Sequence, residues 1–261
     1  MMQKITVLIS FLLFSFSSFS GKIIEGEYSF FREPKQLRIY LDDQKICIEQ
    51  DFNKVIFDFS TEMVIIVSDK IKSYSMFKFD DFNQQISEAA KISFGQLLSS
   101  VSDDKRDSLS SLYNFSHFSD AFITPVMPKF SFERSHEKSP IASQNAYRVV
   151  VKNGKTKLET LSFAVDTLGK GFIPNFQIFK MLQLFLPELS FDHQLSVDYQ
   201  NLMVGGIPLS INSKNFNWQV SSVLDEKIEN SVFSFSDSYN AIDAISLMSF
   251  LVEDRYRSLL N

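Results

Sequence analysis

The chain of 261 residues is 44% hydrophobic and 22% charged, which is the composition of a globular protein with room for one large domain or two small ones. Its net charge of −5 and its lack of a Lys/Arg cluster exclude nucleic acid as a partner, because binding to phosphates requires a dense basic face. The 28 Phe residues are an excess, and since Phe has no polar group they indicate a large apolar core or a lined cavity.

The first twenty residues have the pattern of a secretory signal peptide. Lys4 supplies the positive start, residues 5–16 are mostly apolar, and Ser18-Phe19-Ser20 places small residues at positions −3 and −1 of a cleavage site. The apolar run is shorter than a membrane-spanning helix requires. We expect cleavage before Gly21, a periplasmic or secreted product and no transmembrane span after cleavage, with an uncleaved anchor as the alternative.

Cys47 is the only cysteine, so no internal disulfide can form. It lies in an alternation of apolar residues, and we expect it to be a small buried side chain. A lone thiol in an exported protein fits a bacterial periplasm better than a disulfide-rich eukaryotic secretory route.

Residues 21–79 have the pattern of an antiparallel meander. Short runs rich in Ile, Val, Phe and Tyr alternate with polar turns. Strands are predicted over residues 25–31, 36–41, 45–50, 54–59, 63–68 and 72–78. Leu37, Ile39 and Leu41 alternate with Arg38 and Tyr40, which gives a sheet one apolar face. We expect this sheet to be curved, with the apolar face on its concave side.

A helical insertion is predicted over about residues 80–118. Apolar residues recur at three- and four-residue steps from Phe82 to Val101, and Asp80 or Asp81 is suited to cap this helix. A second, more polar helix is predicted over residues 103–117. The insertion is placed to close over the open face of the sheet.

The remaining residues are predicted to add strands and two further helices. Residues 121–140 hold three of the seven prolines and are interpreted as a connector. Strands are predicted over residues 147–152, 157–165, 207–212, 217–224 and 231–235, with a hairpin turn at Asn153-Gly154. Residues 175–186 are apolar on more than one side, which is typical of a buried or lid helix, and residues 238–260 indicate an amphipathic C-terminal helix. No repeat or low-complexity tract divides residues 21–261, so we expect a single domain.

Motifs for catalysis, metals and cofactors are missing from the sequence. His117, His136 and His193 have no second ligand at metal spacing, and no nucleophile elbow, phosphate loop or dinucleotide fingerprint occurs. We therefore expect no metal, no cofactor, no catalytic residues and no enzymatic activity. An unrecognised hydrolase stays as an alternative, because catalytic triads also assemble from distant residues.

The aromatic residues are the better candidates for a binding site. An apolar face on a half-open sheet must be covered by a helix, a ligand or a partner, and Phe side chains on the sheet and helices are placed to line a hydrophobic cavity between them. The candidate lining residues are Phe57, Phe59, Phe77, Phe79, Phe94, Phe176, Phe179 and Phe185.

Four segments carry a resemblance to a known family. Residues 37–50 form a strand, a polar turn and a second strand, residues 141–147 are similar to an Ile-Ala-Gly-Tyr element, and Gly206-Ile207-Pro208 resembles a Gly-apolar-Pro strand start. Residues 229–233, with Tyr239, resemble a closing signature. Over about residues 23–239, this order resembles the half-barrel family of periplasmic lipoprotein carriers, especially an uncharacterised branch of exported bacterial proteins.

The chain also departs from that family. Ser143 and Gln144 replace the expected Gly and Tyr, Ser236 and Asp237 stand where a Pro-containing turn is expected, and the C-terminal helix is additional. The resemblance implies an α+β half-barrel that holds acyl chains or an apolar peptide, and it transfers no catalytic residue.

The expected fold is α+β, a curved antiparallel half-barrel sheet with a helical lid or insertions and a C-terminal helix. The expected function is that of an exported, carrier-like protein that binds a lipid or acyl chain, or an acylated partner, between sheet and helices. The alternative to ligand binding is an envelope structural or interaction module, with an envelope protein docked on the C-terminal helix.

Overall fold

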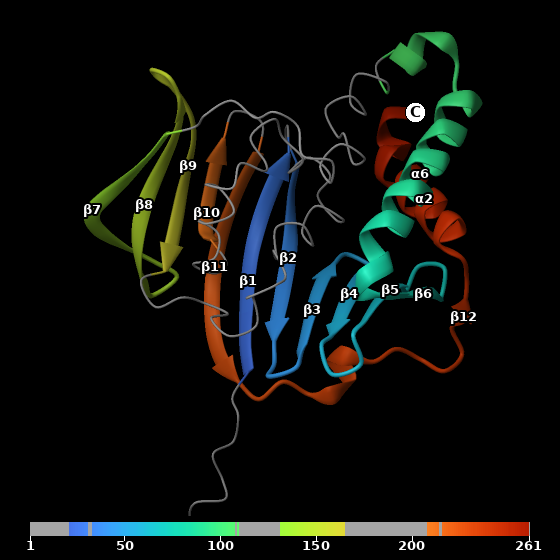
Figure 1. Cartoon of the computed structure of the whole chain (residues 1–261), viewed down its shortest axis with the longest axis horizontal. Helices are drawn as coiled ribbons and strands as arrows, with labels where there is room; N and C mark the ends of the chain where they lie inside the picture. The colour runs from blue at the N-terminus through green and yellow to red at the C-terminus, as the bar shows by residue number, and fades with distance from the viewer. Residues whose placement is uncertain are drawn as a thin grey trace, which may run out of the picture.

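The computed structural model describes residues 21–30, 33–107, 109, 131–164, 208–213 and 216–260. In this part of the chain, twelve strands form one curved sheet that does not close on itself (Figure 1). The strand order is β12-β6-β5-β4-β3-β2-β1-β11-β10-β9-β8-β7, and neighbours are antiparallel except for β12 and β6. The predicted α+β half-barrel is confirmed.

The elements have the following bounds. The strands before the first helix are β1 (Gly21–Phe30), β2 (Glu33–Leu41), β3 (Lys45–Gln50), β4 (Asn53–Asp58), β5 (Met63–Ser68) and β6 (Ser73–Lys78). The later strands are β7 (Ser131–Ile141), β8 (Gln144–Asn153), β9 (Thr156–Ala164), β10 (Pro208–Ser213), β11 (Phe216–Glu226) and β12 (Asn240–Ala241). The helices are α2 (Phe79–Ser100), the 3₁₀ helix η2 (Asn230–Phe233) and α6 (Ala244–Leu260).

The strands β1–β6 form the predicted meander, and β3 and β5 have the predicted bounds. The chain then leaves the sheet, and β1 pairs with β11 as well as with β2. The N-terminal strand therefore lies inside the sheet and joins the meander to β7–β11, a long-range pairing that the sequence pattern does not predict.

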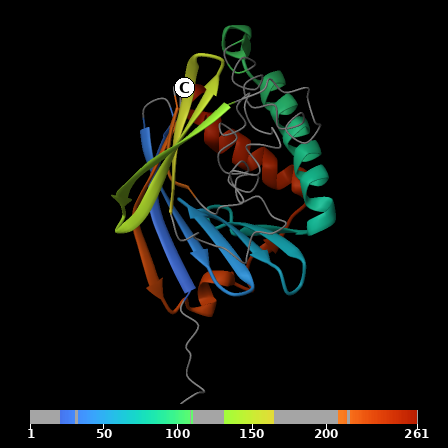
Figure 2. The same cartoon turned by 60° about the vertical axis from the view of Figure 1, so that its left-hand side comes forward.

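Helices α2 and α6 pack against each other on the concave side of the sheet, over β5 and β6 (Figure 2). Phe82, Ile86 and Ala89 of α2 are buried there, as the helical periodicity predicts. The prediction that Asp80 or Asp81 caps α2 is wrong. Both lie in the first turn after Lys78, which makes no side-chain capping bond, and their charges are placed to stabilise the helix dipole instead.

The predicted C-terminal helix begins six residues later than expected. Asn240 and Ala241 pair with β6 instead, which fixes the chain as extended backbone up to that point. Asp243 then accepts hydrogen bonds from the backbone N–H of Ser246 at 2.9 Å and from its hydroxyl at 2.6 Å. This carboxylate satisfies free donors of the first turn, so α6 begins at Ala244.

Two further predictions are wrong. Residues 131–140 belong to strand β7 and not to a connector, and Pro140 is tolerated because β7 is the edge strand of the sheet. Residues 230–233 form η2 and not a strand. The predicted hairpin between β8 and β9 is confirmed, although Asn153 pairs with Thr156 and the turn residues are Gly154, with a φ of 59°, and Lys155.

Several predicted elements lie outside the described residues. The second insertion helix is confirmed at residues 103–107 and 109, and the rest of its predicted range lies outside the described residues. The helix predicted over residues 175–186 also lies outside them, as does Ile207, the first residue of a predicted strand. Among the described helices, none combines the length and the apolar character needed to cross a membrane.

A segment that we call the outer segment, residues 227–239 with η2, connects β11 to β12 past β3 (Figure 1). Its apolar side chains pack on the face of the sheet opposite the helices. There they cover a buried cluster made of Tyr40, Cys47, Ile56 and Val67.

Candidate functional site

The concave face of the sheet is apolar from β6 to β8. Residues directly opposite each other on neighbouring strands share a face, so the strand register places side chains in rows across the sheet. One row crosses β2 to β6 through Leu41, Ile46, Phe57, Val64 and Phe77. A second row crosses β8, β9, β10, β11 and β1 through Val149, Leu161, Ile211, Trp218 and Tyr28. Every side chain in both rows is at most 3% exposed.

Under α2, the concave face is filled by aromatic rings. The ring of Phe82 contacts Phe57 edge-on at a centroid distance of 6.2 Å and Phe77 at 5.5 Å. Edge-to-face packing of this kind is favourable beyond the area that it buries. Helix α2 is therefore fixed on the sheet by the protein's own side chains.

The predicted lining residues fall into separate groups. Phe57 and Phe77 belong to the cluster under α2, and Phe59 and Phe79 form a partly buried edge-on pair at 5.5 Å. Phe94 is buried in a second cluster with Leu97 and Leu109. Phe176, Phe179 and Phe185 lie outside the described residues. That these eight side chains line a ligand cavity stays a prediction.

Trp218 is a central residue of the second row that the sequence reasoning missed. Its indole N–H donates to the carbonyl of Pro208 at 2.9 Å, which fixes the ring on β11. The ring lies directly over Gly26 of β1, where a Cβ atom would approach Trp218 Cη2 to 2.3 Å. Two sequence features could have indicated this contact, the single Trp and a Gly inside a predicted strand. A glycine at such a position often marks the close approach of another part of the chain to the backbone.

The second row ends at β7, the edge strand. Arg134 lies opposite Val149, and its guanidinium carbon is 3.8 Å from the ring centroid of Tyr147. Tyr147 in turn stacks on the buried ring of Phe163 at 5.7 Å. The structure thus places a cation over two stacked aromatic rings at this end of the concave face. The sequence reasoning missed Arg134 because it interpreted residues 121–140 as a connector.

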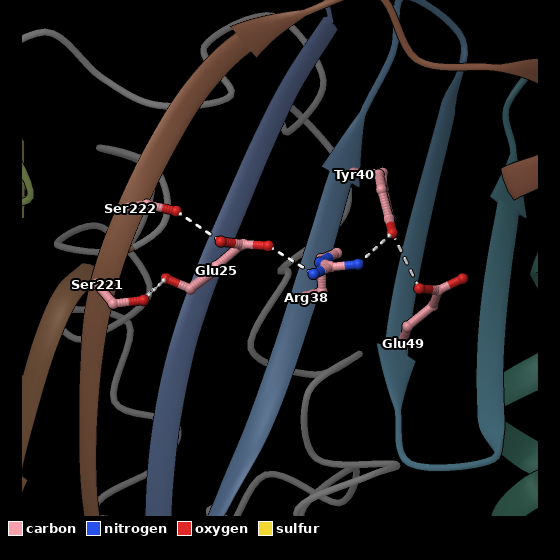
Figure 3. Close-up of polar contacts among 6 residues, drawn as sticks. All are labelled: Glu25, Arg38, Tyr40, Glu49, Ser221 and Ser222. Atoms are coloured by element: carbon pink, nitrogen blue, oxygen red, sulfur yellow. Dashed lines mark hydrogen bonds and ion pairs between the residues drawn. The ribbon is translucent and has the colours of Figure 1, made fainter.

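A polar network crosses the opposite, convex face (Figure 3). Glu25 accepts from the Ser222 hydroxyl at 2.9 Å and pairs with Arg38 at 2.6 Å, and the backbone carbonyl of Glu25 accepts from Ser221. Arg38 donates to the Tyr40 hydroxyl at 3.3 Å, and that hydroxyl donates to Glu49 at 3.0 Å. The network joins β11, β1, β2 and β3 across the middle of the sheet.

Two groups of this network, Tyr40 and Arg38, stay protonated at neutral pH. Burial raises the pKa of Tyr40, with the Glu49 carboxylate adding to this effect, so the phenol remains a donor. The pKa of Arg38 is also raised, chiefly by its hydrogen bond with Tyr40. A protonated phenol and a paired guanidinium suit the network to holding strands together.

Cys47 lies next to this network, beneath the outer segment. Its side chain is buried in the same cluster as Phe233, as the sequence predicted for a small apolar residue. Burial raises the pKa of its thiol far above the ordinary value, so the thiol is unreactive in the folded protein.

The comparisons with known proteins give distant structural likenesses only. No family model and no curated protein matches the chain. An uncharacterised conserved protein from Thermus thermophilus is 6% identical with a TM-score of 0.41, and the match covers 86% of this chain and 91% of that one. The structure of PNGF-II is 10% identical with a TM-score of 0.39, over 88% of this chain and 33% of that one.

A structure of the Pseudomonas aeruginosa MucA/MucB complex is also similar, at 10% identity and a TM-score of 0.36, over 82% of this chain and 56% of that one. This chain thus spans a third of the PNGF-II chain and little more than half of the chain matched in the MucA/MucB complex. At these identities and TM-scores, the likenesses indicate nothing about what this chain binds.

Proposed function

We propose that the chain is exported and that its half-barrel binds a hydrophobic ligand, a lipid or acyl chain, on the concave face, as a carrier and without catalysis. One observation supports this most: the apolar concave face continues through β1 and β11 to β8, whereas α2 and α6 make their main contacts with β5 and β6. The signal-like leader of residues 1–20 supports the compartment.

The aromatic rings under α2 make that part of the concave face a poor place for a ligand. Phe57, Phe77 and Phe82 occupy the space under α2 with their own contacts. The row from Val149 to Tyr28 lies on the strands farther from these helices (Figure 1), and its side chains are at most 3% exposed.

Native mass spectrometry tests the proposal. Residues 21–261 are produced in a bacterial periplasm, purified without detergent, and extracted with solvent to identify bound molecules. We expect a bound lipid at defined stoichiometry. Delipidated, folded protein that takes up neither a fatty acid, nor a phospholipid, nor a neutral apolar dye would overturn the proposal.

The absence of catalysis is tested separately, with a panel of ester and peptide substrates. We expect no turnover above the rate of heat-unfolded protein. Saturable hydrolysis of any substrate by the folded protein would replace the carrier proposal with a hydrolase.

A second candidate function is an interaction module, because each helix of the pair exposes one large apolar side chain. Ile92 of α2 is 45% exposed and Ile245 of α6 is 37% exposed, and the hydroxyl of Ser93 donates to the Ile245 carbonyl at 3.2 Å. If this surface docks an envelope protein, cross-linking in intact cells gives one stoichiometric product that the double change Ile92→Ser and Ile245→Ser removes. The matched control is Phe52→Ser, since Phe52 is also exposed but lies in the β3–β4 turn.

A further inference from the structure

The charge of this protein is unevenly divided along the sheet. Residues 131–164, which form β7, β8 and β9, hold six Lys or Arg and three Glu, a net charge of +3, although the whole chain has a net charge of −5. These strands lie at the opposite end of the sheet from β12 and α6 (Figure 1). One end of the sheet is therefore basic in an acidic protein, and an asymmetry of this kind indicates contact with an anionic surface.

The β8–β9 hairpin gathers four of these cations, which are spaced apart in the sequence and form no run there. Arg148 and Lys152 alternate with the buried side chains of Val149 and Val151, so they lie on the convex face of β8. Lys157 of β9 lies directly opposite Lys152 and therefore shares that face. With the turn residue they form a surface that we call the basic hairpin, made of Arg148, Lys152, Lys155 and Lys157.

The basic hairpin holds more cations than the neighbouring carboxylates pair with. Lys152 pairs with Glu133 at 2.5 Å, whereas no carboxylate among the described residues pairs with Arg148, Lys155 or Lys157, all of which are exposed. Like charges directly opposite each other destabilise a sheet, so the stability of the hairpin does not explain why Lys157 faces Lys152. An anionic surface outside the protein removes this repulsion.

The composition of the basic hairpin favours a lipid bilayer over a protein as that surface. None of the large apolar side chains that are exposed in the described part of the chain lies on β7–β9, and protein interfaces are built around such anchors. Lysine is a compact charge on a flexible stem, and each Lys or Arg near an anionic membrane adds to the attraction. The acidic end of the sheet does not cancel it, because screening limits such interactions to about 10 Å at 0.1 M salt.

We propose that the basic hairpin docks the protein on a bilayer that contains anionic phospholipids. This inference rests on the proposed function, because a lipid carrier has to meet a membrane to take up or release its ligand. It adds the surface of the protein that makes this contact and the charge of the membrane that the surface selects.

Vesicle sedimentation tests the docking. Residues 21–261 are mixed with vesicles of phosphatidylcholine alone, or of phosphatidylcholine and phosphatidylglycerol, so that the apolar leader of residues 1–20 does not contribute. We expect the protein to sediment with the anionic vesicles only, and to be released as salt is added, since the attraction is electrostatic and exposed.

Variants assign the docking to the hairpin. Each lysine is expected to contribute about fivefold, so the double change Lys155→Gln and Lys157→Gln requires on the order of twentyfold more anionic lipid for half-maximal binding. The matched control is Lys72→Gln with Lys91→Gln, two exposed lysines in the β5–β6 turn and on α2, which lowers the net charge equally. We expect this control to bind as the wild type does, and circular dichroism checks that both variants are folded.

The outcomes separate this inference from the proposed function. If the protein binds neither kind of vesicle, if it binds both kinds equally at all salt concentrations, or if both double variants weaken binding alike, docking by the hairpin is wrong and the carrier stands. Tighter binding to soluble polyglutamate than to the anionic vesicles replaces the bilayer with an acidic protein. If the hairpin docks on vesicles but the folded protein takes up no lipid, the docking stands and the carrier fails.

Discussion

At the scale of single residues, two positions are decided by close contacts that only the fold creates. Gly26 leaves room for the Trp218 ring, and Asp58 collects several donors at the end of β4. Asp58 does not stand out in the sequence, since an isolated Asp has many structural roles, and Gly26 is marked only by its place inside a predicted strand. The tertiary contacts give each of them a measurable effect on stability.

We expect Gly26→Ala to destabilise the protein by about 2 kcal/mol, as overpacking of a core does. The new Cβ would lie 2.3 Å from Trp218 Cη2 and 2.8 Å from the carbonyl oxygen of Gln219, and the ring cannot move away without stretching its bond to Pro208. Denaturant unfolding measures the change. The matched control is Gly95→Ala on α2, where no atom lies within 4 Å of the added Cβ and the gain in helix propensity stabilises by up to about 1 kcal/mol.

We expect Asp58 to make a pH-dependent contribution to the stability of the folded protein. Burial raises the pKa of this carboxyl, but hydrogen bonds from Ser60 and from Lys45, at 3.0 Å, outweigh burial and lower it. We expect Asp58→Asn to cost about 2 kcal/mol at pH 7, as for other hydrogen bonds to charged groups. The pKa of Asp58 is lower in the folded protein than in the unfolded chain. The loss of stability in Asp58→Asn therefore has its full size above about pH 4, and it shrinks as the pH falls through the folded pKa.

Unfolding curves of the wild type and of Asp58→Asn between pH 3 and pH 8 provide the measurement. Asp237→Asn is the control, since Asp237 is an exposed carboxylate in the connection between η2 and β12. We expect this control to leave the pH dependence of the wild type unchanged. A difference between wild type and Asp58→Asn that grows on acidification contradicts the assignment.

At the scale of elements, the outer segment is the part whose role only packing reveals. Phe233 lies on the cluster around Cys47, the ammonium of Lys54 donates to the carbonyl of Ser234 at 2.5 Å, and the Tyr239 hydroxyl donates to Asp69 at 2.9 Å. These contacts hold an irregular stretch of chain against the convex face. The sequence alone suggested a strand at residues 231–235, because alternating Val and Phe are typical of strands.

We expect Phe233→Ala to open the outer segment and to expose Cys47. In the wild type, iodoacetamide reacts with Cys47 only when the protein unfolds, since the thiol is buried. Each loss of about 1.4 kcal/mol in the free energy of local opening raises the labelling rate about tenfold. Phe52→Ala, at an exposed position, is the control and leaves the rate unchanged. Rapid labelling of the wild type contradicts the buried position of the thiol.

At the scale of the whole molecule, we propose export because the first twenty residues have the pattern of a signal peptide. Expression of residues 1–261 in a bacterium is expected to give a periplasmic product whose N-terminal residue is Gly21. Replacing Leu12 and Leu13 with Arg interrupts the apolar run and is expected to keep the uncleaved chain in the cytoplasm. Intact mass of the fractionated protein measures both results. A periplasmic product that keeps residues 1–20 indicates an anchor instead of a cleaved signal.

The sequence by itself determined the local features of this protein. The meander of β1–β6, the helix after it, the β8–β9 hairpin and the burial of Cys47 follow from alternation, helical periodicity and turn residues, which act between near neighbours in the chain. The apolar concave face also follows, because Leu37, Ile39 and Leu41 must share one side of a strand. Those signals predicted the fold class correctly.

Only the tertiary structure decided how distant segments meet. The pairing of β1 with β11 and the edge position of β7 depend on segments far apart in the chain, and no local periodicity encodes such pairings. The contact of Arg134 with Tyr147 forms within the β7–β8 hairpin, and it was missed because residues 131–140 were interpreted as a connector. Residues 131–140 and 230–233 were interpreted wrongly for the same reason, since an edge strand tolerates a Pro and a packed connector resembles a strand. Long-range packing therefore decided which strands lie at the edges of the sheet and which stretch of chain covers its convex face.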